Sequence, residues 1–387
     1  MCEELKRIFG RPMVYMLFIG CLLINLWVLW NYSGQRDLVS ASREVADRLT
    51  DGAAGGFLQV NAKNSSAIAN DLLRAAPEAD NLSREINIPT VLQMVEGADR
   101  MAELLGPEEM ATAYISGMDL KDGAADGARK VYAQLEPVME KNREDGSARA
   151  FFVPCHMDFF EMFSGNLLPF LIAESIVCAV LLMINTANDS FSSKLTGLIF
   201  TCQKGRRVQR TKCISGLLAG LAFTATLWGV TIGLAAVIFP LGSLWRTPLG
   251  SMMVLDKFYP VIPWFSMSLI AYIGFQLLIA LGCVALFSMA AYALVLRLHQ
   301  SFSSFMILGF VSALIYTITW GFPKDSAVYL ALQWNPVDLA RKAGHWLVNG
   351  SSFMSPRFYE IGTFGLWAVA LAAVILLVTR RFYREDL

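Results

Sequence analysis

The stretch NTANDSFSSKLTGLIFTCQKGRRVQRTKCISGLL, residues 185–218, decides how this chain is organised. It lies between two strongly apolar segments, and it carries six basic side chains against a single acid, Asp189. Lys and Arg residues in short connections between membrane spans stay in the cytoplasm. If the flanking segments cross a membrane, this stretch is therefore a cytoplasmic connection.

The composition indicates that the flanking segments do cross a membrane. Of the 387 residues, 55% are hydrophobic and 17% are charged, whereas a soluble domain carries about 25% charged residues. The deficit is concentrated in apolar runs close to the roughly 20 residues that a helix needs to cross a bilayer. Six spans are predicted, at residues 13–31, 166–187, 215–239, within 264–296, 303–320 and 361–379.

The long segment 264–296 leaves an alternative, because it could be broken into two spans. A seventh span would move the C-terminus to the other side of the membrane. With six spans and residues 1–12 inside, the inner segments hold 13 Lys and Arg residues and the two short outer loops hold 6. This asymmetry favours an all-α polytopic membrane protein with six transmembrane helices and both termini in the cytoplasm.

Residues 32–164 form a polar domain between the first and second spans, with a net charge of −9. The topology places this domain outside the cytoplasm. Apolar residues recur with helical spacing in RDLVSASREVADRLT (36–50) and TVLQMVEGADRMAELL (90–105). We also expect a helix over 128–140 and a turn over 116–127. The sequence therefore predicts a helical extracytoplasmic domain, followed by the remaining spans within 165–387.

The chain lacks the motifs of an enzyme. It contains no Gly-Lys pair, so it has no phosphate-binding GxxxxGK[ST] loop, and it contains neither HExxH nor GxSxG. Its three histidines lie in different regions, and its seven cysteines have no metal-binding spacing. We expect no catalytic residue, no metal site, no cofactor in this chain and no nucleic-acid partner. Only RRFYREDL follows the sixth span, so energy for transport would come from a gradient or from a partner.

The opening stretch contains a short amphipathic helix near residues 190–203. Its apolar residues fall at a 4-3-4 spacing, which places them on one face of a helix. This face consists of Phe191, Leu195, Leu198 and Cys202. Lys194 lies on the other side, and Gly197 lets a neighbouring chain approach closely. The helix could rest on anionic lipid, at about 1 kcal/mol per basic residue, or it could bind a partner protein.

With this helix in place, the chain resembles the permease subunits of type-2 ABC exporters. The shared features are the first span with its large outer domain, the cytoplasmic helix, and a C-terminal group of four further spans. Gly205-Arg206 and Lys212 before the third span, and Asn335-Pro336 in the last outer loop, add to the resemblance. The resemblance implies that the short helix is a coupling helix that contacts a separate ATP-binding subunit through Phe191, Lys194, Leu195, Gly197, Leu198 and Arg206.

The same resemblance implies the rest of the assembly. Two ATP-binding subunits would bind ATP and Mg, and a second permease, identical or homologous, would complete the translocation path. The complex would lie in the lipid bilayer of a bacterial plasma membrane as a multi-pass exporter. The transported substrate stays open between a peptide, a lipid and a drug.

Two features inside the spans bear on this path. Glu174 lies within the second span, where an acidic side chain is costly and is a functional candidate by default. It is the candidate for the translocation path, and the alternative is a structural bond to a neighbouring hydroxyl group or water. The third span contains Gly216-xxx-Gly220 and Gly229-xxx-Gly233. Nine residues at about 100° each place the two pairs on opposite faces, which favours helix packing.

Two other classes of protein remain as alternatives. A span, an outer helical domain and a second span form the layout of bacterial sensory receptors, but only about 26 residues separate the second span from the third. A gradient-driven secondary transporter would show internal repeats and broken helices with several buried charges. Neither feature is found in this sequence, so the permease of an ABC exporter is the preferred interpretation.

Overall fold

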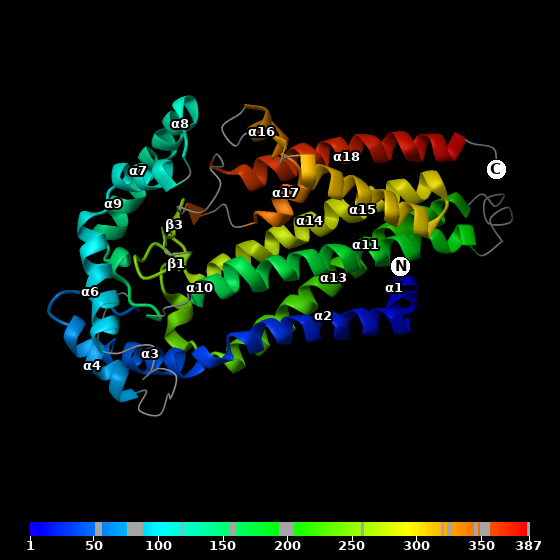
Figure 1. Cartoon of the computed structure of the whole chain (residues 1–387). Helices are drawn as coiled ribbons and strands as arrows, with labels where there is room; N and C mark the ends of the chain where they lie inside the picture. The colour runs from blue at the N-terminus through cyan, green and yellow to red at the C-terminus, as the bar shows by residue number, and fades with distance from the viewer. Residues whose placement is uncertain are drawn as a thin grey trace.

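The computed structural model describes most of the chain. The described residues are 1–50, 56–75, 88–117, 119–154, 159–192, 205–256, 259–318, 321–322, 327–343, 347–348 and 357–384. They form an elongated bundle of long helices, with the smaller helices of the polar domain (residues 32–164) gathered at one end (Figure 1). Among the described residues, six helices are long and apolar enough to cross a membrane, and these six are the candidate spans.

Five of these spans are single helices. They are α2 (Pro12–Asn31), α13 (Gly205–Ile238), α14 (Leu269–Leu298), α15 (Ser301–Ile318) and α18 (Tyr359–Arg384). The second span is continuous over 34 residues. It consists of α10 (Phe159–Glu161), the π-helical segment η3 (Met162–Leu167) and α11 (Leu168–Ser192). Because α14 is one unbroken helix, the seven-span alternative is wrong.

The second span and α13 are longer than predicted. Each comprises 34 residues, which corresponds to about 50 Å at 1.5 Å per residue. The hydrocarbon core of a bilayer is about 30 Å thick. Both helices are therefore longer than the hydrocarbon core is thick, and their ends on the side away from the polar domain flank the segment 193–204, which lies outside the described residues.

The first and last helices end on the same side of the bundle. The amphipathic helix α1 (Cys2–Phe9) precedes α2, and the chain turns between them at Gly10. Figure 1 shows α1 and the end of α18 at the end of the bundle opposite the polar domain. This arrangement requires an even number of crossings, as six spans provide.

In the part of the chain that the structure describes, the polar domain includes six α-helices of nine residues or more. They are α3 (Arg36–Leu49), α4 (Ser65–Ala75), α6 (Ile88–Leu104), α7 (Pro107–Gly117), α8 (Asp122–Ala133) and α9 (Glu136–Glu144). The helices expected over 36–50 and 90–105 are confirmed as α3 and α6.

Two local predictions in this domain are wrong. The helix expected over 128–140 is two helices, because the chain breaks between α8 and α9 and Pro137 lies in the first turn of α9, where its missing N–H is tolerated. The turn expected over 116–127 ends early, since α8 already begins at Asp122. Ala125, Ala128 and Tyr132 follow one another at helical spacing and are buried, and this packing favours a helix over the turn-forming residues.

The segment between α13 and α14 completes the polar domain, which the sequence did not reveal. It contains η4 (Gly242–Arg246) and the two-residue strands β1 (Leu255–Asp256), β2 (Tyr259–Pro260) and β3 (Ile262–Pro263). Met252 N–H donates to Ala148 O at 2.9 Å, and Thr247 Oγ1 donates to Phe151 O at 3.4 Å. The strand β3 pairs with β4 (Leu347–Val348) from the loop before α18. These short strands are absent from the all-α prediction.

One hydrophobic core joins the polar domain to the long helices. Phe159 and Phe160, at the start of the second span, connect the two parts. The Phe159 ring lies 5.3 Å from that of Phe239, which directly follows α13, and the Phe160 ring lies 5.4 Å from that of Tyr272 in α14. By contrast, α15 and α18 are covered sparsely by the rest of the chain. In an apolar 18-residue stretch of each helix, only 6% of the residues are buried. These two helices therefore leave broad faces for lipid or for another protein.

The two glycine pairs of α13 lie on opposite faces, as predicted. A Cβ atom on Gly220 would lie 2.9 Å from Cβ of Ala179, so α11 and α13 approach closely there. By contrast, a Cβ atom on Gly229 or Gly233 would meet no atom within 4 Å. Within the described ranges, the first pair lies in a contact between helices and the second pair does not.

Candidate functional site

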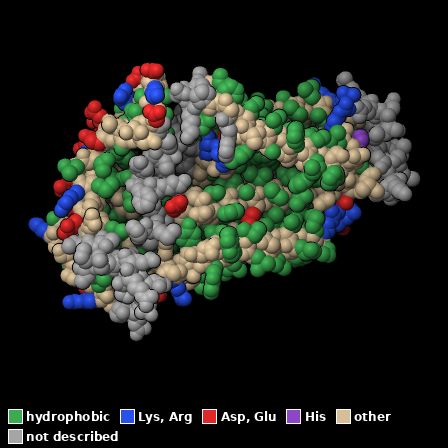
Figure 2. All heavy atoms as spheres, viewed as in Figure 1, with side chains coloured by type: hydrophobic (Ala, Val, Ile, Leu, Met, Phe, Trp, Pro, Cys, Tyr) green, Lys and Arg blue, Asp and Glu red, His purple; other side chains and the backbone are tan. Residues whose placement is uncertain are grey.

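A cavity of about 430 Å³ opens among α11, α14, α15 and the short helix α17 (Pro336–Arg341). Its walls are aliphatic and aromatic side chains, among them Ile176, Val180, Phe287 and Leu308. Figure 2 shows a hollow with an apolar surface on the face where α11 and α15 lie. The cavity is therefore a site for an apolar group within the membrane part of the chain.

One end of this cavity carries a positive charge. The guanidinium group of Arg341 lies 5.1 Å above the ring of Tyr316, and Nη2 of Arg341 lies 3.0 Å from Oδ1 of Asp338. Asp338 is buried, and its Oδ1 also forms an ion pair with Nζ of Lys342 at 3.6 Å. Figure 2 shows Lys and Arg side chains at the end of the hollow that is closer to the polar domain.

The Asn335-Pro336 pair positions this charged end. Oδ1 of Asn335 accepts hydrogen bonds from the backbone N–H groups of Val337 and Asp338, at 2.9 and 2.8 Å, and so caps α17. Pro336 occupies the first turn of α17, where no backbone donor is needed. The cap fixes the helix that carries Arg341, one turn further on, at the mouth of the cavity.

Glu174 lies at a junction of three helices rather than in this cavity. Its Oε2 accepts a hydrogen bond from Nδ2 of Asn25 in α2 at 2.9 Å, and Asn25 lies 3.4 Å from Oγ1 of Thr231 in α13. Glu174 is half-buried and does not line the cavity, although its neighbours Ala173 and Ile176 do. Its role in the translocation path stays a prediction. Asn25 and Thr231 were not predicted as partners of Glu174, although an amide within an apolar span is a signal that the sequence carries.

One turn deeper in the membrane part, α2 and α11 bring two thiols together. Sγ of Cys21 lies 3.6 Å from Sγ of Cys178, and both side chains are buried. We expect mild oxidation with a membrane-permeant oxidant such as iodine to join them, because a disulfide needs an approach of only about 1.5 Å more. Mass spectrometry should find the linked peptides 12–31 and 168–192.

Serine variants provide the control for this cross-link. Cys21→Ser should abolish it, whereas Cys283→Ser should leave it unchanged, because Cys283 lies on α14. Linked peptides that contain Cys213 or Cys283 in place of Cys178 would contradict the packing of α2 on α11.

At the end of the bundle away from the polar domain, Asp189 joins the N-terminal residues to α11. Its Oδ2 lies 2.5 Å from Nη2 of Arg11 and 3.3 Å from Nη2 of Arg7. Lys212, on the adjacent part of α13, is 4% exposed. The acid identified in the opening stretch therefore ties α1 and α2 to the last turn of α11.

The structure places the predicted coupling residues in part. Phe191 belongs to the last turn of α11, which continues to Ser192, and not to a separate helix. Its ring centroid lies 4.3 Å from that of His299 and 6.1 Å, edge-on, from that of Phe382. Arg206 lies in the first turn of α13, where the backbone alone is described. The remaining predicted contacts lie outside the described residues, and they are Lys194, Leu195, Gly197 and Leu198.

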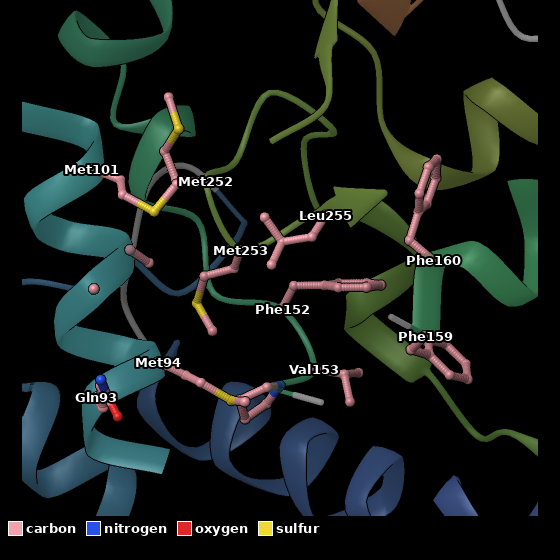
Figure 3. Close-up of a pocket in the computed structure, with 13 residues that line it drawn as sticks. Gln93, Met94, Met101, Phe152, Val153, Phe159, Phe160, Met252, Met253 and Leu255 are labelled. Atoms are coloured by element: carbon pink, nitrogen blue, oxygen red, sulfur yellow. The ribbon is translucent and has the colours of Figure 1, made fainter. Parts of the chain in front are cut away.

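A second pocket, of about 200 Å³, lies in the polar domain (Figure 3). Four methionines line it, Met94 and Met101 from α6 and Met252 and Met253 from the segment before α14. Figure 3 shows their side chains gathered between α6 and that segment. Methionine side chains adapt to irregular apolar surfaces, so this pocket suits an apolar group of variable shape.

No protein-family model matches this chain, and no curated protein or solved structure matches it. Among the residues described above, no three His, Cys, Asp or Glu side chains are grouped so that they could hold a metal ion. The functional assignment therefore rests on the residues and on their arrangement.

Proposed function

We propose that this chain is the membrane-spanning permease subunit of an ABC exporter and that separate ATP-binding subunits drive it. The observation that carries the proposal is the geometry around residues 193–204. Two 34-residue spans, the second span and α13, flank this segment, and α11 and α13 pack closely through Gly216 and Gly220. A force on the segment would reach both helices.

The proposal includes the orientation and the partners. Both termini lie in the cytoplasm, the polar domain 32–164 lies outside, and the complex belongs to the plasma membrane of a bacterium. Two ATP-binding subunits hold ATP and Mg, while this chain has no catalytic role. The sparsely covered faces of α15 and α18 are available to a second permease and to lipid.

The mechanism follows from what α11 contacts. One face of α11 lines the apolar cavity through Ile176 and Val180, and its last turn leads into the proposed coupling helix. Closure of the ATP-binding subunits would displace that helix, shift α11 and change the shape of the cavity. ATP can shift the equilibrium between two conformations only by the difference in its affinity for them.

The decisive experiment is to purify the tagged chain from its native membrane in mild detergent and to identify its partners. We expect an ATP-binding subunit in stoichiometric amount. A chain that comes out alone after cross-linking would overturn the proposal. It would leave the basic segment to contact lipid, and a gradient-driven transporter would become the better interpretation.

A substitution in the proposed coupling helix sharpens this test. Leu195→Asp should lower the recovery of the ATP-binding subunit about 30-fold, because a charge at a central interface position costs at least about 2 kcal/mol. Thr196→Asp, which adds the same charge to the opposite side of the helix, is the matched control and should retain the subunit. Equal recovery with both variants would contradict the assigned contact face.

A further inference from the structure

We infer that the cavity among α11, α14, α15 and α17 binds an amphiphile with an apolar chain and an anionic head group, drawn from the leaflet on the side of the polar domain. As a binding site, the cavity stands on its own geometry. As the site that defines the exported substrate, it rests on the permease function proposed above.

The length of the cavity matches one leaflet. Its lining on α15 runs from Phe305 to Tyr316, which is about 16 Å along a helix at 1.5 Å per residue. Half of the hydrocarbon core of a bilayer is about 15 Å. The volume of about 430 Å³ falls in the range of about 300–1,000 Å³ that is typical of ligand pockets.

Among the described lining residues, the deep part of the cavity offers a polar ligand no free side-chain donor. The hydroxyl group of Ser312 donates to Leu308 O in its own helix at 2.8 Å, so it is already satisfied. Gly309 contributes to the open space, because a Cβ atom there would meet no atom within 4 Å. An aliphatic chain fits such a wall, since it leaves no polar group without a partner.

The mouth of the cavity selects the charge of the head group. Arg341 and Lys342 face one buried carboxylate, Asp338, so these three groups together carry one net positive charge. The side chain of Arg341 is 37% exposed. Among the residues that the structure describes, Asp338 accepts a hydrogen bond from Nη2 of Arg341, which leaves other N–H donors of the guanidinium group for a carboxylate or phosphate. The ring of Tyr316 holds the guanidinium plane in place.

Photolabelling of the purified full-length chain tests this inference. The probes are a palmitic acid analogue with a diazirine in its chain, and a quaternary ammonium amphiphile of the same length and diazirine position. We expect the acid to label peptides within 169–180 and 305–316 at least ten-fold more than the ammonium probe does. Equal labelling by the two probes, or labelling spread evenly over all six spans, would overturn the inference.

Two variants with matched controls separate the chain from the head group. Gly309→Leu fills the cavity and should abolish labelling, whereas Gly274→Leu, at an exposed position on α14 that is equally open, should not. Arg341→Gln should reduce the preference for the acid at least five-fold, while Arg357→Gln, at an exposed arginine outside the lining, should not. The Arg341 variant keeps the inference testable if the larger side chain at position 309 impairs folding.

The remaining outcomes are also decisive. If a Ser312→Cys variant forms a disulfide between two copies of the chain and the acid does not label it, a second copy occupies the cavity and the inference is wrong. A chain that binds the acid but purifies without an ATP-binding subunit would support the binding site and overturn the proposed permease function. Loss of acid labelling with the ATP-binding subunit still bound would overturn the binding site and support the proposed permease function.

Discussion

Gly220→Leu is expected to lower the free energy of unfolding by about 1–3 kcal/mol, the usual cost of forcing extra atoms into a packed interface. A Cβ atom at this position already lies 2.9 Å from Cβ and 3.5 Å from Cα of Ala179. The obstacle on α11 is partly backbone, so it cannot move aside as a flexible side chain would. The measurement is the fraction of protein that stays monodisperse by size-exclusion chromatography after a series of heating steps.

Gly229→Leu is the matched control for this prediction. It changes the same residue type in the same helix, but a Cβ atom there would meet no atom within 4 Å. Its melting curve should coincide with that of the unchanged protein. Equal destabilisation by the two variants would mean that helix propensity or membrane insertion, and not the contact with α11, governs the effect.

Asp189→Asn is expected to release α1 from the bundle. The carboxylate of Asp189 lies against two guanidinium groups, and its side chain is 20% exposed. Hydrogen bonds to charged groups at such partly buried sites contribute about 1.5–3 kcal/mol. Amide hydrogen exchange, followed by mass spectrometry, should become at least ten-fold faster over residues 3–9 in the variant.

Two further variants control for the ion pair itself. Arg7→Gln should have little effect, because the side chain of Arg7 is 58% exposed and exposed pairs contribute about 0–1 kcal/mol. Arg11→Gln should resemble Asp189→Asn, since the side chain of Arg11 is 27% exposed. The charge exchange Arg11→Asp with Asp189→Arg should restore part of the protection of α1. Unchanged exchange in Asp189→Asn would show that apolar contacts alone hold α1 in place.

The features that the sequence predicted correctly depend on local composition. A span is recognised from the apolar content of about 20 consecutive residues, because the cost of placing a polar group in the bilayer applies residue by residue. The six spans follow from this rule, and so does Glu174 as an exception within one of them. Helices α3 and α6 follow from the 3.6-residue period in the same way. The Asn335-Pro336 pair is also a local signal, and it does begin α17.

The tertiary structure alone decided which of these elements meet. The segment before α14 completes a domain whose helices lie about one hundred residues earlier in the chain, as the bond from Met252 to Ala148 shows. The cavity combines Ile176, Leu308 and Arg341 from three separate elements. No local pattern encodes such contacts, because they depend on how the helices pack. The sequence therefore determined the class of protein and its spans, while packing determined the cavity, its charged mouth and the partners of Glu174.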